Sequence, residues 1–377
     1  MLIVQKYGGA TLATPQKIKN IARRISDSKK SGTNIVAVVS AMGQTTNQLI
    51  ELAHQVSENP SLRELDMLLS VGERTSMALL TMALNDLNCL AISFTGSQAG
   101  ILTDESHIAA NIIDVKAFRV SDALQKNKVV ILAGFQGVSP ITKEITTLGR
   151  GGSDTTAVAM AAYLNADHCE ILKDVDSIFT ADPKSIPNAK PIRHLHFNQL
   201  LEMTTWGAKV LHYKSVQMAK DKNVKLYVGP ATDKASAGTW ISADHRSEKN
   251  IPLAVNTHSK ILEIENTSVD LFFADLIKNQ IGFPQIIKQT DQSLFITGST
   301  ENLSAIEKKY PLKNTKLCSV SLTMTQSMTT EIKHQIEQKI KSENIEIIDQ
   351  IQTELSLNLI LSSKNKDHAI QLLHAMI

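Results

Sequence analysis

The sequence predicts an α/β protein: a three-layer domain with a mainly parallel sheet, followed by two small ferredoxin-like α+β modules. Three observations lead to this prediction. Short apolar runs alternate with longer amphipathic segments up to about residue 230, as in domains where strands and helices alternate. A stretch rich in glycine, proline and small residues follows at 229–246. Beyond it, a β-α-β-β-α pattern occurs twice.

The first part begins with an apolar run at 2–6 and a continuously apolar run at 34–39, as expected for strands that are covered on both faces. Between them, Thr14 is a suitable N-cap and Pro15 a suitable first-turn residue for a helix. The same reasoning predicts further strands at 90–94, 128–133, 170–173 and 224–228, and helices at 67–84 and 154–164.

The second part reads as two successive modules. The first is expected to contain strands at 261–265, 283–288 and 294–297 and a helix at 269–279. The second is expected to contain strands at 317–323, 345–351 and 355–361 and helices at 329–342 and 366–376. We therefore predict domains at 1–241, 251–312 and 313–377. Neither module contains a cluster of histidine, cysteine or acidic residues, so catalysis is expected in the first domain.

Composition excludes several classes of protein. Hydrophobic residues make up 42% and charged residues 20% of the chain, which is typical of soluble globular proteins. The formal charge of +2 over 377 residues gives no electrostatic reason to expect nucleic acid or a membrane as a partner. We find neither a secretory signal nor a run long enough to span a membrane. Cys89, Cys169 and Cys318 are expected to be buried thiols, which places the protein in the cytoplasm.

The most informative segment is the glycine-rich run at 147–156. Its glycines allow a tight turn and a close approach of a ligand to the backbone. Ser153 and Asp154 then open a helix, whose first N–H groups favour an anion. Arg150 adds a planar cation that can bind a carboxylate through two hydrogen bonds. On this loop alone, a glycine-rich turn with an ordinary N-cap remains an equal alternative.

Two further segments point to phosphate chemistry. Lys6 ends the first strand and precedes Gly8 and Gly9, which suits phosphate binding at the edge of a parallel sheet. This is neither a Walker A loop nor a dinucleotide-binding G-x-G-x-x-G motif. Residues 173–183 begin at a strand end and contain three aspartates, as a nucleotide-binding loop would. Taken singly, a solvated lysine before a turn and a solvated acidic turn are the better explanations of these two segments.

Together, the three segments resemble those of the aspartate kinases in order and approximate spacing, and so do residues 39–43, 69–73, 134–137 and 206–212. The resemblance is close over 2–241 and loose beyond. That family has an amino-acid-kinase domain followed by two ACT modules. The resemblance implies transfer of the ATP γ-phosphoryl group to the side-chain carboxylate of L-aspartate. The product would be 4-phospho-L-aspartate, on the route to lysine, threonine, methionine and diaminopimelate. Mg²⁺ would accompany ATP, and a homo-oligomer would form through the C-terminal modules.

The resemblance also implies a role for each matching residue. Lys6 and Asp154 would act in catalysis, with Asp154 either binding the substrate ammonium group or orienting Lys6. L-Aspartate would be surrounded by Ser40, Thr45, Thr46, Glu73, Arg150, Gly151, Gly152 and Ser153. ATP would be held by Lys6, Tyr7, Gly8, Gly9, Lys173, Asp174, Phe179, Asp182, Lys209 and Val210. No side chain is expected to be a metal ligand.

Two positions depart from the family pattern and keep alternatives open. Ala10 and Lys173 stand where the family usually has threonine. One alternative is another small-molecule kinase of the same fold, acting on glutamate, acetylglutamate, carbamate or UMP. The other is a non-catalytic subunit that binds nucleotide or pairs with an active enzyme.

The C-terminal modules carry a prediction about regulation. The turns after their first strands contain no glycine, and Met324 and Met328 crowd the second turn. Backbone N–H groups would therefore reach an effector's carboxylate poorly. This predicts weak or no inhibition by lysine and threonine. The alternative is that hydroxyl groups replace the backbone contacts, from Thr267, Ser268, Thr323 or Thr325.

Overall fold

The computed structural model describes residues 1–232, 238–245, 247–265, 267–278, 283–290 and 292–377. They form two compact units. The first unit comprises 1–178, 191–201 and 209–246, and the second comprises 179–190, 202–208 and 247–377. Two short segments from the first 241 residues thus belong to the second unit. The three domain boundaries expected from the sequence remain predictions.

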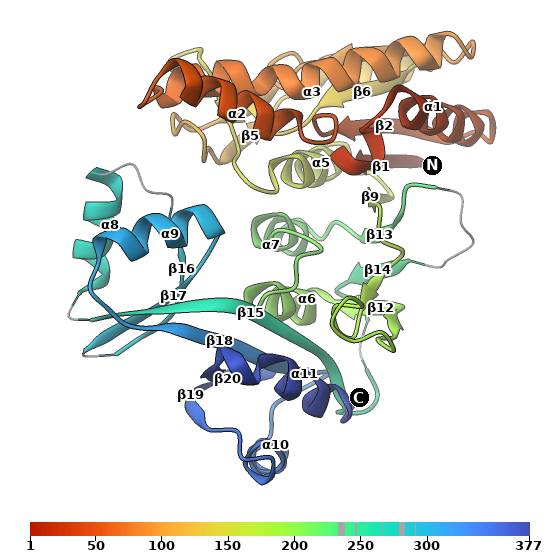
Figure 1. The fold of residues 1–377 in the computed structure, drawn as a ribbon. Helices are drawn as coiled ribbons and strands as arrows, with labels where there is room; N and C mark the ends of the chain where they lie inside the picture. Colours follow the sequence, from red (N-terminus) through yellow and green to blue (C-terminus); the bar gives the residue numbers. More distant parts are fainter. Residues whose placement is uncertain (233–237, 246, 266, 279–282, 291) are drawn as a thin grey trace. The chain divides into compact units, whose positions relative to one another are not determined.

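The first unit is built on an eight-stranded sheet in the order β12-β14-β13-β9-β1-β2-β6-β3 (Figure 1). Neighbouring strands run parallel except β13 and β14, which confirms the expected mainly parallel sheet. The strands are β1 (Leu2–Tyr7), β2 (Asn34–Val39), β3 (Ala91–Phe94), β6 (Val129–Ala133), β9 (His168–Lys173), β12 (His194–His196), β13 (Leu226–Pro230) and β14 (Thr239–Ser242).

Helices cover both faces of this sheet, because its central strands are apolar on both sides. Apolar side chains of α1 (Pro15–Lys30) and α3 (Leu62–Asn85) pack in one core with those of β1, β2, β6 and β9. The opposite face is covered by α5 (Gly152–Tyr163), whose first ten residues are all buried (Figure 1). Further helices are α2 (Thr45–Val56), α4 (Phe118–Gln125), α6 (Phe197–Thr205) and α7 (Tyr213–Asp221).

A second, small sheet in the first unit was not expected from the sequence. Its order is β5-β4-β7-β8, with β4 (Ile101–Thr103), β5 (Ile112–Val115), β7 (Gln136–Val138) and β8 (Ile145–Thr147). These strands have only three or four residues each, too few for a clear alternation of apolar and polar side chains. The last of them ends at Thr147, directly before the glycine-rich loop.

The second unit contains a six-stranded sheet in the order β16-β17-β15-β18-β20-β19. The first β-α-β-β-α module is β15 (Pro252–Glu265), α8 (Val269–Lys278), β16 (Gln285–Gln289), β17 (Ser293–Thr297) and α9 (Thr300–Lys309). The second is β18 (Leu312–Met324), α10 (Thr330–Ser342), β19 (Ile347–Gln352), β20 (Ser356–Ser362) and α11 (Lys366–His374).

Both modules occur as expected, but their sheets are continuous because β15 and β18 pair antiparallel. These two strands also begin earlier than predicted, at Pro252 and Leu312 rather than at residues 261 and 317. Their additional residues are interspersed with polar side chains, which obscured them in the sequence. The helix expected at 269–279 ends at Lys278, and residue 279 lies outside the described residues.

The two short segments from earlier in the chain pack within the second unit. Ala181 and Ile186 lie in the apolar core around α10 and α11. Glu202 accepts hydrogen bonds from Trp206 Nε1 at 2.9 Å and from Thr353 Oγ1 at 2.7 Å. His258 Nε2 lies 2.9 Å from the carbonyl oxygen of Thr205. These buried contacts explain why both segments belong to this unit.

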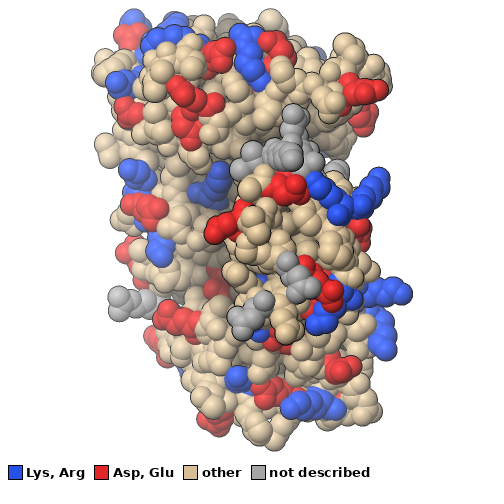
Figure 2. Space-filling model, turned by 90° about the vertical axis from the view of Figure 1, so that its left-hand side faces the viewer, with Lys and Arg blue, Asp and Glu red and all other residues tan. Residues whose placement is uncertain are grey.

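The surface and the cysteines agree with the sequence analysis. On the face shown in Figure 2, lysine and arginine side chains are interspersed with aspartate and glutamate side chains, as the formal charge of +2 suggests. Cys89, Cys169 and Cys318 are free and buried. Among the described residues, no helix is both long enough and apolar enough to cross a membrane.

Candidate active site

A cluster of buried Lys6, buried Asp154 and half-buried Lys173 lies at the carboxyl ends of β1 and β9. Lys6 is 7% exposed, and its Nζ lies 2.6 Å from Asp154 Oδ1. Lys173 Nζ lies 3.5 Å from Asp154 Oδ2. The lysines come together because β1 and β9 are parallel neighbours that end at the same edge of the sheet. Asp154 reaches them from the first turn of α5.

The charges of this cluster are strongly coupled. Burial alone would raise the pKa of Asp154, but Lys6 and Lys173 outweigh this effect and lower it. The pKa of Lys173 is lowered by burial and by Lys6, although Asp154 opposes the shift. Two lysines therefore face one carboxylate, each at ion-pair distance from a different oxygen, although Oδ1 has no partner of hydrogen-bond geometry among the described residues. The cluster carries one positive charge in excess, which favours an anionic ligand at this edge.

The segment after β1 forms a close backbone turn. Gly8 N donates a hydrogen bond to the carbonyl oxygen of Leu172 at 3.1 Å. A Cβ atom on Gly9 would lie only 2.7 Å from the carbonyl oxygen of Ala41, so no larger residue fits there without a shift. The ring of Tyr7 is fully buried in the core beside α1. Tyr7 therefore has only its backbone available at the site.

The glycine-rich loop enters α5 through two left-handed glycines. Gly149 has φ +69° and Gly151 has φ +72°, a region that residues with a side chain rarely adopt. A Cβ atom on Gly151 would also lie 2.3 Å from Cβ of His212. The exposed Arg150 stands between these two glycines. Its position at the N-terminus of α5 is therefore set by backbone conformations that few other sequences allow.

Glu73 on α3 is buried with half of its carboxylate unsatisfied. It is 4% exposed, and its Oε1 accepts a hydrogen bond from Ala41 N at 3.0 Å. Within the described part of the chain, its Oε2 has no hydrogen-bond partner. Burial raises the pKa of Glu73 to about 7, although the Ala41 N–H group and the charge of Lys6 oppose this. An unsatisfied buried carboxylate oxygen indicates a site for a ligand that donates hydrogen bonds.

The other residues expected around aspartate lie in the same unit. Ser40 follows β2 and is half-buried, as are Thr45 and Thr46 at the start of α2. The Thr45 hydroxyl donates to the carbonyl oxygen of Met42 at 2.7 Å. Gly152 and Ser153 are buried at the start of α5. A Cβ atom on Gly134 would lie 2.8 Å from that of Ser153, so the helix start packs closely on the chain after β6.

The residues expected around ATP are divided between the two units. In the first unit, Lys173 Nζ donates a hydrogen bond to the carbonyl oxygen of Val210, while Asp174 and Lys209 are exposed. Phe179 and Asp182 belong to the second unit. Asp182 Oδ1 accepts a hydrogen bond from Lys184 N at 2.9 Å there. Within the first unit, the structure thus brings Lys173 and Val210 together.

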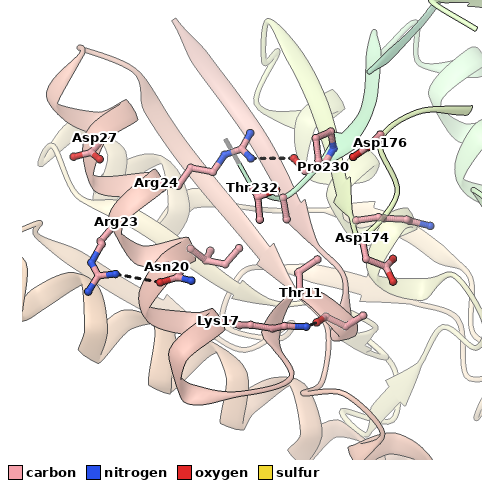
Figure 3. A pocket seen from close by; sticks show the side chains of 14 residues that line it. Thr11, Lys17, Asn20, Arg23, Arg24, Asp27, Asp174, Asp176, Pro230 and Thr232 are labelled. Atoms are coloured by element: carbon pink, nitrogen blue, oxygen red, sulfur yellow. Dashed lines mark hydrogen bonds between the residues drawn. The ribbon is translucent and has the colours of Figure 1, made fainter. Parts of the chain in front are cut away.

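A cavity of about 600 Å³ opens beside the ends of β1, β9 and β13 (Figure 3). It is lined by one side of α1 and by Lys173, Asp174 and Asp176. Lys17 donates to the carbonyl oxygen of Ala10 at 2.7 Å, and Arg24 donates to that of Pro230 at 3.0 Å. The charged side chains of this lining are of both signs, so the lining does not define one class of ligand: Lys17, Arg23, Arg24 and Lys173 are cations, and Asp27, Asp174 and Asp176 are carboxylates.

Sequence reasoning gave no role to two residues of this region. His212 accepts a hydrogen bond from Lys214 N through Nδ1 at 3.4 Å and packs against Gly151. Its pKa is lowered by burial and by the neighbouring Lys214. Asp66, in the interior of α3, is fully buried and accepts hydrogen bonds from Thr147 Oγ1, two residues before Gly149, and from Ile108 N, whose own carbonyl oxygen lies beside Gly149. Only the resemblance over 206–212 pointed to His212, and nothing in the sequence pointed to Asp66.

The raised pKa of Glu73 predicts a pH-dependent loss of stability. Its pKa of about 7 lies above the ordinary value of 4.5, so ionisation of this group opposes folding. The contribution of protonated Glu73 to the free energy of unfolding is complete below pH 4.5. It is lost as the pH rises through 7, and the loss is at most about 3 kcal/mol. Relative to Glu73→Gln, the wild-type Tm should fall between pH 5.5 and 8.5. Thermal unfolding of both proteins across this pH range measures the fall in Tm. A Tm difference that does not change with pH would contradict the raised pKa of Glu73.

The first part of the chain has the strongest similarity to known proteins. Residues 1–230 match the amino acid kinase family. Over 227 residues the chain is 54% identical to an aspartokinase of Mycolicibacterium smegmatis, which covers 60% of this chain and 54% of that protein. The chain thus spans about half the length of the relatives that it matches at this level.

Two other matches cover the whole chain. Over 396 aligned residues it is 35% identical to aspartokinase 2 of Bacillus subtilis, which covers 99% of this chain and 97% of that protein. The crystal structure of E. coli aspartokinase III in complex with aspartate and ADP matches with a TM-score of 0.80 at 21% identity, covering 100% of both chains. At that identity the structural match is one of fold.

Proposed function

Because the chain belongs to the amino acid kinase family, and within it to the aspartokinases, we propose that it transfers the γ-phosphoryl group of ATP to the side-chain carboxylate of L-aspartate. The products are ADP and 4-phospho-L-aspartate. The observation that carries the proposal is the Lys6–Asp154–Lys173 cluster beside the glycine-rich start of α5. Such an arrangement suits a transferred phosphoryl group, whose negative charge needs fixed positive partners.

The proposed reaction requires electrostatic stabilisation rather than a general base. The attacking carboxylate is already ionised at pH 7. The barrier arises because this anion must approach the polyanionic end of ATP. Lys6, Lys173, the Gly8 and Gly9 backbone and the N-terminus of α5 offset that repulsion. Because each oxygen of Asp154 lies at ion-pair distance from a lysine, we assign Asp154 to orienting Lys6 rather than to binding the substrate ammonium group.

On the substrate side, we assign Arg150 to the α-carboxylate and Glu73 to the ammonium group. The unsatisfied Oε2 of Glu73 supports this assignment, because an ammonium group supplies donors in hydrogen-bond range. The positive charge of the ammonium group would also stabilise ionised Glu73. Glu73 would therefore release a proton when aspartate binds near neutral pH. Ser40, Thr45, Thr46, Gly151, Gly152 and Ser153 complete the proposed site.

On the nucleotide side, we assign the phosphates to Lys6, Gly8 and Gly9 and the remainder of ATP to Tyr7, Lys173, Asp174, Phe179, Asp182, Lys209 and Val210. Mg²⁺ would neutralise part of the phosphate charge. The described residues contain no group of three histidine, cysteine, aspartate or glutamate side chains that could hold a metal. This donor set fits an ion that is bound mainly through phosphates and waters. Asp174 and Asp176, which line the cavity, would accept hydrogen bonds from those waters.

A trapping assay tests the reaction. Purified protein is given MgATP, hydroxylamine and one acceptor at a time: aspartate, glutamate or acetylglutamate, with ADP release measured for carbamate and UMP. We expect acyl hydroxamate with aspartate alone. Faster turnover with another acceptor would support a different kinase of this fold. No turnover with any acceptor would support a non-catalytic subunit.

The assembly and the location are also proposals. We infer a homo-oligomer that forms through the C-terminal modules, whose sheet ends in β16 and β19. Light scattering on the purified protein measures this, and a monomer at working concentration would exclude it. The three unpaired, buried cysteines support a reducing compartment such as the cytoplasm.

We further expect little inhibition by lysine or threonine. Met324 and Met328 are buried in the core of the second module. The Thr325 hydroxyl donates to the carbonyl oxygen of Lys249 at 2.6 Å, and Thr323 is fully buried. Met324, Met328 and Thr325 are thus used by the fold itself, whereas the buried Thr323 hydroxyl has no hydrogen-bond partner among the described residues. The test is the aspartate-dependent rate with each amino acid, singly and together. A midpoint below about 1 mM, roughly −4 kcal/mol of binding, would reveal a working effector site.

A further inference from the structure

Asp66 joins three separate segments of the first unit. Its Oδ1 accepts hydrogen bonds from Thr147 Oγ1 at 2.5 Å and from Ile108 N at 3.1 Å. Its Oδ2 lies 2.6 Å from His107 Nδ1 and 3.3 Å from Ile108 N. The residue is fully buried. A carboxylate in such a place is costly unless its oxygens are satisfied, and here the partners come from positions 41, 42 and 81 residues away.

Two partners of Asp66 lie at the start of the glycine-rich loop. Thr147 is the last residue of β8 and is followed directly by Leu148, Gly149 and Arg150. Ala110 N donates to the carbonyl oxygen of Thr147 at 2.9 Å. A Cβ atom on Gly149 would lie 2.8 Å from the carbonyl oxygen of Ile108. By holding both Thr147 and Ile108, Asp66 fixes the start of the loop against the neighbouring segment 108–110.

The backbone at Ile108 needs this support. Its φ of +67° is unusual for a β-branched residue, and such a conformation persists only when its surroundings enforce it. The two hydrogen bonds from Ile108 N to the Asp66 carboxylate supply part of that enforcement. His107 is held in addition by Glu144, whose Oε2 lies 3.5 Å from His107 Nε2.

Asp66 also lies on the helix that carries Glu73. The two carboxylates are seven residues apart on α3, which places them on the same side of the helix about 10 Å apart along its axis. Glu73 is the proposed partner of the substrate ammonium group, and Arg150 is the proposed partner of its α-carboxylate. The rigid helix α3 therefore carries Glu73 and, through Asp66, anchors the loop that carries Arg150.

We propose that Asp66 is a positioning residue that sets the distance between Glu73 and Arg150, and thereby selects an α-amino acid of the right length. It touches neither substrate nor nucleotide, and it acts through Thr147 and Ile108. This role rests on the proposed kinase function. Loss of the Asp66 hydrogen bonds should therefore raise KM for aspartate and leave KM for ATP almost unchanged.

The kinetic test uses Asp66→Ala, Asp66→Asn and a core control, Leu80→Ala, on the same helix. We expect Asp66→Ala to raise KM for aspartate at least 10-fold and to change KM for ATP less than 2-fold. Asp66→Asn should lie between wild type and Asp66→Ala, because its amide oxygen still accepts from Ile108 N. Leu80→Ala removes a fully buried apolar side chain and should lower Tm without changing the ratio of the two KM values.

A second pair of variants covers the case in which Asp66→Ala does not fold. Thr147→Val removes only the hydroxyl that donates to Asp66, and Thr147→Ser retains it. We expect Thr147→Val to raise KM for aspartate and Thr147→Ser to leave it at the wild-type value. Equal changes in both KM values, or no effect of Thr147→Val, would overturn the proposal.

A proteolysis test separates this proposal from the proposed function. Arg150 is exposed, so trypsin cleaves between Arg150 and Gly151 once the loop opens locally. We expect Asp66→Ala and Thr147→Val to be cleaved there at least 10-fold faster than wild type, and Leu80→Ala at the wild-type rate. If wild type fails to phosphorylate aspartate, the proposed function fails, and cleavage still decides whether Asp66 anchors the loop. Equal cleavage of all variants would overturn the anchor whatever the enzyme's substrate.

Discussion

Lys6→Ala is expected to lower kcat at least 100-fold and to leave the Kd for ATP within a few-fold of wild type. Lys6 is placed to act on charge that develops during transfer, and removing one such donor typically costs about 10²–10³ in rate. ATP binding should persist because most of the nucleotide contacts proposed here come from other residues. Single-turnover kinetics measures the rate, and equilibrium binding of a non-hydrolysable analogue measures Kd. More than a tenth of the wild-type kcat would contradict the role of Lys6.

A matched double variant separates catalysis from folding. Lys6→Ala leaves Asp154 buried with only Lys173 nearby, and breaking a buried pair in this way typically costs about 3–5 kcal/mol of stability. Lys6→Met combined with Asp154→Asn removes both charges and should recover most of the Tm. It should not recover activity. Recovery of activity together with Tm would mean that Lys6 serves the fold rather than the reaction.

The fold was predictable where the pattern of apolar residues was long and unambiguous. The continuous run at 34–39 became β2, and the capped helix expected from Thr14 became α1, with Thr14 Oγ1 accepting from Lys17 N at 3.3 Å. The short strands β4, β5, β7 and β8 had no such pattern. The N-terminal half of β15 was missed because its pairing with β18, which starts 60 residues later, provides its stability.

Long-range pairing also limited the prediction of the site. Parallel strands made it possible to expect Lys6 and Lys173 at one edge of the sheet, and the helix start at Ser153 and Asp154 made it possible to expect an anion site there. Asp66 could not be found, because its importance comes from hydrogen bonds to residues 41 to 81 positions away. The roles assigned to individual residues remain predictions.

Arg150→Lys is expected to raise KM for aspartate at least 10-fold and to change KM for ATP less than 2-fold. Lysine keeps the positive charge, so a purely electrostatic role would survive the change. It loses the planar fork that binds a carboxylate through two parallel hydrogen bonds, and its single ammonium group sits on a flexible chain. The left-handed glycines on either side hold the backbone of residue 150, so a lysine there has little freedom to compensate by shifting the loop.

Arg119→Lys is the matched control for this substitution. Arg119 is on α4, where its guanidinium lies 4.7 Å from the centroid of the Phe94 ring, and it is not among the residues that line the cavity at the ends of β1, β9 and β13. It should leave both KM values unchanged. Steady-state kinetics with each substrate varied at saturating levels of the other gives the comparison. If Arg150→Lys raised both KM values equally, Arg150 would belong to the nucleotide site. If it raised neither, the α-carboxylate would have to be bound by another group, and the N-terminus of α5 is the remaining anion site on this loop.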